Sequence, residues 1–161
     1  MVFSVKCVLM LCCFGGMTVY LIMAANEDSR SYQVTRWKHL IGFFAASIIG
    51  VSHMKDKSLL EIGMTMLFVL LMFILGMIGV YGMADGFVFA NLTLLLGSIG
   101  GIAGIGLVIL IMILACVSAM LEMLFRKMVN IEGFKQNVHI AFVPHILAGF
   151  LAALIALLIW L

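Results

Sequence analysis

Long apolar runs separated by short charged segments make up the pattern of this chain. The longest run contains no lysine or arginine between Lys57 and Arg126. The runs lack the residue-by-residue alternation of a transmembrane barrel strand, so the pattern favours helices. A bilayer core of about 30 Å needs roughly 20 helical residues to cross it. We therefore predict an all-α, polytopic integral membrane protein that forms a single membrane domain over residues 1–161.

Four segments have the length to cross the membrane, and two are better placed at shallow depth. The first shallow segment has basic residues on both sides, and at 1.5 Å per residue it reaches only about 22 Å. An interfacial or re-entrant position removes that conflict. The first span can also be a secretory signal peptide, although we favour a retained helix. The predicted spans are about 2–24, 59–83, 102–125 and 138–161, and the shallow segments are about 39–53 and 87–97.

The glycine-rich stretch GSIGGIAGIG, residues 97–106, decides how often the chain crosses. The surrounding run of about 40 residues would be roughly 60 Å long as one straight helix, which is twice the hydrocarbon thickness. The run must therefore break, and glycine makes a break least costly. A hairpin here would return Arg126 to the side of Asp85, whereas a single crossing would keep the basic loops together. Charge favours the single crossing, and the hairpin is the alternative.

The same glycines are candidates for helix packing. Gly97 and Gly101 are four residues apart, and so are Gly100 and Gly104. Small residues at this spacing let two helix backbones approach closely in lipid. We predict a contact with another helix or with a second copy of the chain, and the alternative is a plain hinge or packing role.

Ionisable residues inside membrane segments are costly and often functional, which draws attention to Glu61 and His145. Glu61 follows Lys57 by four residues, so an ion pair at the membrane edge is the simpler explanation. His145 comes directly after Pro144, whose ring loosens the preceding helical turn. A kinked helix with a titratable side chain can carry protons or line a pore. The alternative is a neutral histidine that is hydrogen-bonded to a neighbouring helix.

Composition supports the membrane environment and adds little chemistry. Hydrophobic residues make up 66% of the chain, charged residues make up 10%, and the mean hydropathy is +1.32. A soluble domain of this size cannot bury that much apolar surface. The net charge of +2 is too small to favour nucleic acid binding. We find no nucleophile and base set, phosphate loop, zinc-protease motif or acidic pair, so we expect no enzymatic activity, no metal and no cofactor.

A basic cluster formed by Arg126, Lys127 and Lys135 is placed in a cytoplasmic loop. Glu122 precedes Arg126 by four residues, which is the spacing of a helical ion pair. The two lysines are then available to acidic lipid headgroups, at about 1 kcal/mol per basic residue near an anionic leaflet.

One stretch carries a family resemblance. Residues 121–147, LEMLFRKMVNIEGFKQNVHIAFVPHIL, join Met-rich hydrophobic segments through a short basic and polar connection. This stretch resembles part of the small hydrophobic non-structural protein 2A of flaviviruses. The resemblance implies a viral protein of the endoplasmic reticulum membrane that organises replication and assembly complexes through protein and RNA contacts. It assigns no role to any individual residue.

Two functions follow as expectations. The favoured one is a non-enzymatic, multi-pass scaffold or subunit of a membrane-bound complex in an endoplasmic reticulum-type membrane. Its partners would be the lipid bilayer and other membrane helices or a second copy, with RNA added only if the viral resemblance holds. The alternative is a small oligomeric ion or proton channel lined by Pro144, His145 and Glu61.

Overall fold

The structure is a computed structural model that describes residues 5–53, 56–129 and 140–160. Over these ranges the chain forms six helices and no strand, which confirms the predicted all-α class. The helices are α1 (Val5–Ser31), α2 (Arg36–His53), α3 (Leu59–Met77), α4 (Met83–Gly100), α5 (Ile102–Met128) and α6 (Val143–Trp160). Among the described helices, α3, α4 and α5 are long and apolar enough to cross a membrane. The four crossings stay a prediction.

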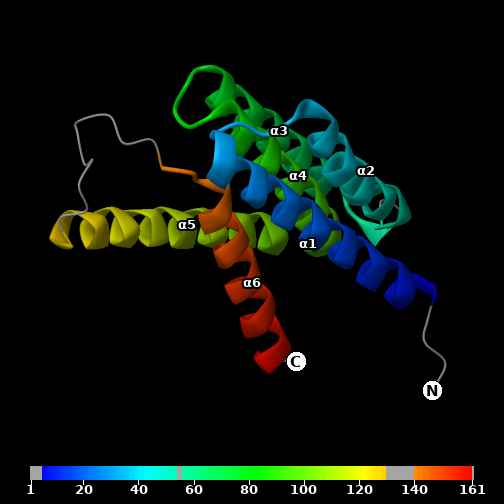
Figure 1. The fold of residues 1–161 in the computed structure, drawn as a ribbon. Helices are drawn as coiled ribbons and strands as arrows, with labels where there is room; N and C mark the ends of the chain where they lie inside the picture. Colours follow the sequence, from blue (N-terminus) through cyan, green and yellow to red (C-terminus); the bar gives the residue numbers. More distant parts are fainter. Residues whose placement is uncertain (1–4, 54–55, 130–139, 161) are drawn as a thin grey trace.

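Helix α4 lies at the centre of the fold. It packs against α2, α3 and α5, and most of its side chains are buried (Figure 1). Residues 87–97, which we expected to form a separate shallow segment, are the buried middle of this helix. Residues 39–53 belong to α2, a helix of 18 residues whose buried face packs between α1 and α4. The sequence did not distinguish these positions, because a helix that is apolar on all sides suits a protein core and lipid equally.

Helix α3 has sequence signals at both ends. At its start, the Ser58 side chain accepts a hydrogen bond from the backbone of Glu61, and the Glu61 carboxylate accepts one from the backbone of Ser58. This reciprocal pair is a capping box. The helix ends at Met77, and Gly79 in the following turn has a positive φ of 80°. The predicted span 59–83 therefore ends earlier than expected.

The chain reverses at Gly101, between α4 and α5. Gly101 has a φ of 57°, which glycine adopts without a Cβ clash. Eight residues of a straight helix span about 12 Å, yet Gly104 lies against the backbone of Leu96. Helix α5 therefore runs back along α4 (Figure 1). The backbone thus reverses as the hairpin alternative requires, although the charge argument did not favour it. The positive-inside tendency acts on loops and does not set local backbone geometry, and the number of crossings stays a prediction.

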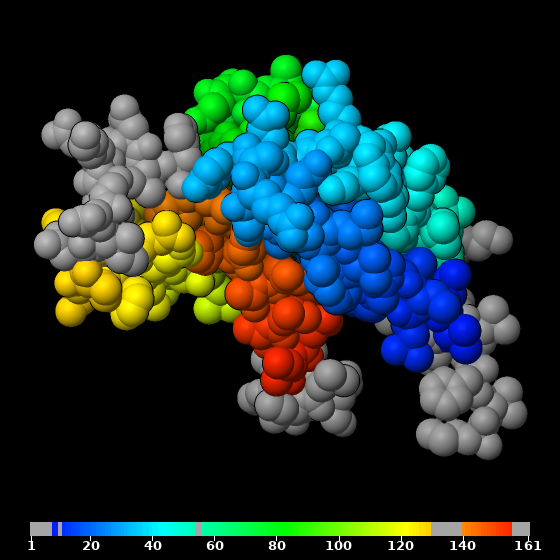
Figure 2. Space-filling view, in the orientation of Figure 1, coloured from blue at the N-terminus to red at the C-terminus, as the bar shows by residue number. Residues whose placement is uncertain are grey.

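The ends of α5 and α6 project from the body formed by the other helices (Figure 2). Both α3 and α5 carry large apolar side chains on their outer faces, and the exposed set includes Leu60, Leu67, Leu71, Leu110, Val117 and Leu121. Apolar surface of this extent is covered by lipid or by another helix when a protein sits in a membrane. The outer faces thus agree with the apolar composition of the chain.

Candidate functional site

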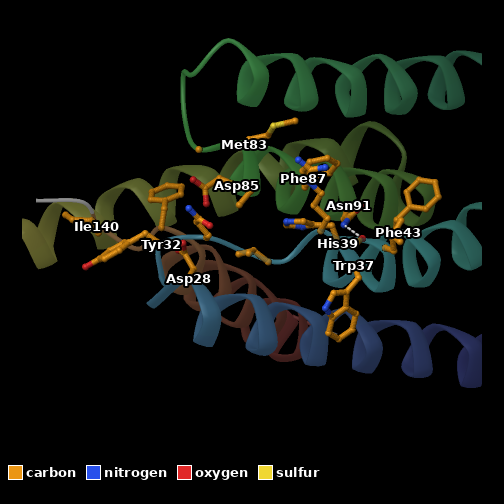
Figure 3. Close-up of a pocket in the computed structure, with 17 residues that line it drawn as sticks. Asp28, Tyr32, Trp37, His39, Phe43, Met83, Asp85, Phe87, Asn91 and Ile140 are labelled. Carbon is orange, nitrogen blue, oxygen red and sulfur yellow. Dashed lines mark hydrogen bonds between the residues drawn. The ribbon is translucent and has the colours of Figure 1, made fainter. Parts of the chain in front are cut away.

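A pocket of about 1140 Å³ opens among the ends of α1, α2 and α4 and the segment before α6 (Figure 3). Aromatic side chains form much of its wall, among them Trp37, Phe43 and Phe87. Its polar lining includes Asp28, Gln33, Arg36, His39, Asp85 and Asn91. A large pocket that combines apolar walls with several convergent polar groups is the usual location of a binding or active site.

Two buried carboxyl groups share this pocket. Asp28 is 6% exposed and Asp85 is 8% exposed, although they are 57 positions apart in the sequence. Figure 3 shows both side chains at one end of the pocket, with His39 farther along it. The two groups are close enough for their charges to interact. Like charges in a buried site repel each other, so the pair favours a state in which one carboxyl group keeps a proton.

Asp28 lies near the end of α1 and also holds the start of α6. Its Oδ2 atom accepts a hydrogen bond of 3.0 Å from the backbone N–H of Val143, the first residue of α6. Burial raises the pKa of the Asp28 carboxyl group, and hydrogen bonds from the backbones of Val143 and Phe142 act in the opposite direction. The first and last helices of the described chain are therefore joined at this carboxylate.

Asp85 occupies the first turn of α4, where a negative charge suits the helix N-terminus. The backbone N–H of Gly82 donates to its carboxylate. A Cβ atom at Gly82 would lie 2.9 Å from Oδ2 of Asp85, so the glycine leaves room for this contact. Both carboxylates thus bind backbone N–H groups at helix starts. An asparagine could accept the same hydrogen bonds without charge repulsion, so capping alone does not explain two acids in one pocket.

The connection between α1 and α2 is held by Glu27. Its carboxylate pairs with Lys38 at 2.8 Å and accepts hydrogen bonds from both the backbone and the hydroxyl group of Thr35. These contacts, with Lys38 the strongest, lower the pKa of Glu27 to about 2. Tyr32 between the two helices has a φ of 53°, a left-handed conformation that ends α1. This fixed turn brings the end of α1 and the start of α2 to the same pocket.

A polar network surrounds His39 inside the pocket wall. The Tyr20 hydroxyl lies 2.8 Å from Nδ1 of His39, and the Asn91 amide donates to the His39 carbonyl oxygen at 3.1 Å. Gly42 makes the network possible, since a Cβ atom there would lie 2.7 Å from the Tyr20 ring and 2.8 Å from Nδ2 of Asn91. Buried polar groups linked in this way hold one another in a single arrangement.

The predicted helix-packing glycines do not share one face. Gly97 faces α3, where an added Cβ would lie 2.7 Å from Cγ2 of Thr65, and Gly104 faces the last turn of α4. Gly101 is the break itself and lies beside the Glu61 side chain, while Gly100 has open space around its Cα. A face of residues four apart requires a continuous helix, and this helix ends between them.

The closest approach of two helices near the pocket uses other glycines. A Cβ atom on Gly76 of α3 would lie 3.1 Å from the Cα atom of Gly86 on α4. The sequence shows these two glycines, one on each side of the turn at 78–82. It does not show that they face each other, because that depends on where α3 ends and α4 begins.

The predicted pore residues are not brought together. Glu61 lies at the start of α3, 3.9 Å from Lys57 and beside Gly101. His145 lies in α6, with Nδ1 2.9 Å from the Ser118 hydroxyl and Nε2 2.9 Å from Glu122, both on α5. These contacts correspond to the alternative of a histidine bonded to a neighbouring helix.

Pro144 does not kink a helix, which corrects the kink that we expected. It is the second residue of α6, in the first turn, where a backbone N–H has no partner within the helix. In the basic cluster, Arg126 pairs with Glu122 and Lys127 is exposed, while Lys135 lies outside the described residues.

The pair Asp28 and Asp85 was missed at the sequence level. Each is an acid at the margin of an apolar run, and this position was the only signal that the sequence offered. Within the described chain, no three His, Cys, Asp or Glu side chains lie close enough to hold a metal ion.

Fold and site together define a class: an apolar, all-helical protein whose pocket holds two buried carboxyl groups. Comparisons with protein-family models, with curated proteins and with solved structures found nothing that matches this chain. The resemblance to the flaviviral protein stays a prediction, and the function is argued from the site itself.

Proposed function

We propose that this protein is a membrane-associated aspartic hydrolase that cleaves a peptide bond, with Asp28 and Asp85 as its catalytic pair. The observation that carries the proposal is the burial of both carboxyl groups in one pocket. Two acids that share a site and one proton provide a general base and a general acid at the same pH. This departs from our expectation of no enzymatic activity, which rested on finding no nucleophile and base set, phosphate loop, zinc-protease motif or acidic pair in the sequence.

The reaction needs only water and the two carboxyl groups. The ionised carboxylate takes a proton from a water molecule. At the same time, the oxygen of that water molecule attacks the carbonyl carbon of the peptide bond. The protonated carboxyl group gives its proton to the carbonyl oxygen, which forms a neutral tetrahedral diol. The carboxyl group that took the proton from water then gives it to the nitrogen as the C–N bond breaks. One hydroxyl group of the diol gives its proton to the other carboxylate, which restores one protonated and one ionised group. A carboxylic acid and an amine leave the site.

The shape and lining of the pocket support a polypeptide substrate. Its volume of about 1140 Å³ is slightly larger than the usual range for ligand pockets, which is roughly 300–1,000 Å³. Several residues of a chain fit this space, and the aromatic walls suit apolar side chains. The pocket begins at the first turn of α4, a helix apolar enough to cross a membrane. A substrate segment at the membrane surface therefore reaches the carboxyl pair most directly.

The test uses the purified chain reconstituted in liposomes. The substrates are synthetic peptides with about 20 apolar residues and varied polar flanks, incubated in ¹⁸O-labelled water and analysed by mass spectrometry. Cleavage should place one ¹⁸O atom in each new carboxyl terminus, because water is the nucleophile. Asp28→Asn and Asp85→Asn should each reduce the rate by about 10²-fold or more. A statine peptide, which mimics the tetrahedral diol, should inhibit the wild-type protein.

A matched control is Glu122→Gln, which removes an acid that does not line the pocket. This variant should cleave at the wild-type rate. The proposal fails if no peptide in the set is cleaved, or if either asparagine variant cleaves as fast as the wild type. Circular dichroism of the asparagine variants should match that of the wild type, since asparagine can still accept the backbone hydrogen bonds.

A scaffold role is the second candidate, and the exposed apolar faces of α3 and α5 favour it. Such faces suit contacts with helices of a membrane complex. Cross-linking in native membranes from single photoreactive residues on the outer face of α5 tests this role, and an absence of protein adducts would argue against it. Location in the endoplasmic reticulum and contacts with RNA stay predictions.

A further inference from the structure

A third polar side chain, His39, lies in the wall of the pocket that holds the carboxyl pair. It is 6% exposed and sits in the first turn of α2. Its ring stacks on Phe87 with centroids 4.8 Å apart and an interplanar angle of 23°. The Tyr20 ring meets it edge-on, with centroids 6.0 Å apart. The imidazole is therefore held by aromatic rings on two sides and cannot turn freely.

The hydrogen bonds around His39 determine which ring nitrogen carries the proton. A backbone carbonyl only accepts, so the atom of Asn91 that meets the His39 carbonyl oxygen is the amide nitrogen. The Tyr20 hydroxyl lies 2.8 Å from Nδ1 of His39. A phenol O–H is a stronger donor than an imidazole N–H, so this bond is favoured with the Tyr20 hydroxyl as the donor. Nδ1 then accepts, and the neutral ring carries its proton on Nε2.

The Nε2 atom has no hydrogen-bond partner among the described residues, and His39 lines the pocket (Figure 3). A donor that is held at a pocket wall and has no partner within the described residues is a place for an acceptor on a ligand. Because the imidazole is neutral, it adds no charge beside the carboxyl pair and suits an uncharged oxygen atom.

We propose that His39 contacts the substrate and donates a hydrogen bond from Nε2 to a carbonyl oxygen of the bound polypeptide. This inference rests on the proposed function, since it assigns a further residue to the same site. Tyr20 acts as a positioning residue, because its hydroxyl fixes the donor on Nε2, and Asn91 holds the His39 backbone through its carbonyl oxygen. The bond strengthens as negative charge develops on the oxygen during attack by water, so it lowers the barrier more than it improves binding.

The first test reads the proton position directly. ¹⁵N spectra of histidine-labelled protein in nanodiscs at pH 7 distinguish the two neutral tautomers and the charged ring, and His39→Gln assigns the signal. The expected result is a neutral ring with its proton on Nε2 in the wild type and a mixture of tautomers in Tyr20→Phe. A proton on Nδ1, or a charged ring, would overturn the proposal whatever the enzyme does.

The second test measures cleavage of the peptide set. His39→Met removes the donor but keeps an apolar side chain, and kcat should fall by about 10²-fold with little change in KM. His39→Gln restores an N–H donor and should recover much of that loss, which a purely structural role would not give. If His39→Met matches the wild type while Asp28→Asn is inactive, the role of His39 is wrong and the hydrolase stands. If Asp28→Asn also matches the wild type, both proposals fail.

Discussion

Replacing Gly104 by alanine should destabilise the protein through the turn at Gly101. The added Cβ atom would lie 2.5 Å from the carbonyl carbon of Leu96 and 3.0 Å from the nitrogen of Gly97, with the Leu96 oxygen nearer still. These are backbone atoms, so no side chain can move to make room, and α5 must shift away from α4. Overpacking of this kind costs about 1–3 kcal/mol and more where the backbone is rigid. We expect a loss of about 3 kcal/mol in the free energy of unfolding.

The matched control is Gly106→Ala, two residues farther along α5. A Cβ atom at Gly106 meets nothing within 4 Å. Alanine also favours the helical state by about 1 kcal/mol relative to glycine, so this variant should be neutral or slightly more stable. Equilibrium unfolding in mixed micelles, followed by circular dichroism, gives both values. Equal stability of the two variants would show that α5 does not fold back against α4 at this point.

Three further predictions concern the network, the α1–α2 connection and the topology. Gly42→Ala should destabilise the protein by about 1–3 kcal/mol and mix the tautomers of the pocket histidine in ¹⁵N spectra, whereas Gly63→Ala, where a Cβ meets nothing within 4 Å, should do neither. The pKa of Glu27 is lowered from 4.5 to about 2, so its contribution to stability is present above pH 4.5 and lost as the pH falls towards 2; acid titration of unfolding should show this loss, and Glu27→Gln should remove it. If the helices cross the membrane as they pack, single cysteines at Met83 and Met128 in a cysteine-free chain should label from one side, and a cysteine at Val51 should label from the other. Labelling of Met128 from the side of Val51 would refute the hairpin.

Local signals in the sequence were sufficient for several features of the fold. Continuous apolar runs predicted helices, and the glycine-rich stretch predicted a break where Gly101 now ends α4. The spacing of Lys57 and Glu61 predicted an ion pair that the structure contains at 3.9 Å. Each of these depends on residues within about one or two turns of helix, where spacing alone fixes which side chains meet.

The features that failed depend on contacts between distant segments. Apolar periodicity does not tell a lipid-facing helix from one surrounded by protein, so the central position of α4 was not visible. The carboxyl pair required knowing that the end of α1 lies beside the start of α4. Two of the glycines predicted to pack against a helix, Gly97 and Gly104, lie at close helix contacts, but with α3 and α4 respectively. The spacing of four residues suggested one shared face, which the sequence alone could not exclude.

The capping role of the two carboxylates and their proposed catalytic role can be weighed by their energies. Two unit charges repel by about 4 kcal/mol at about 4 Å and by about 2 kcal/mol at about 8 Å, with the effective dielectric that suits protein sites. A helix N-terminus stabilises a carboxylate by about 0.3–1 kcal/mol, and Asp28 and Asp85 each have one such terminus, at α6 and α4. Two termini therefore offset at most about 2 kcal/mol, while burial adds a further penalty to a second charge. Burial and repulsion together therefore favour a state in which one of the two carboxyl groups keeps its proton. The N-termini of α4 and α6, which hold the two acids in place, thus stabilise a single negative charge at the pair. With one group ionised and the other protonated, one acid can activate water and the other can donate a proton.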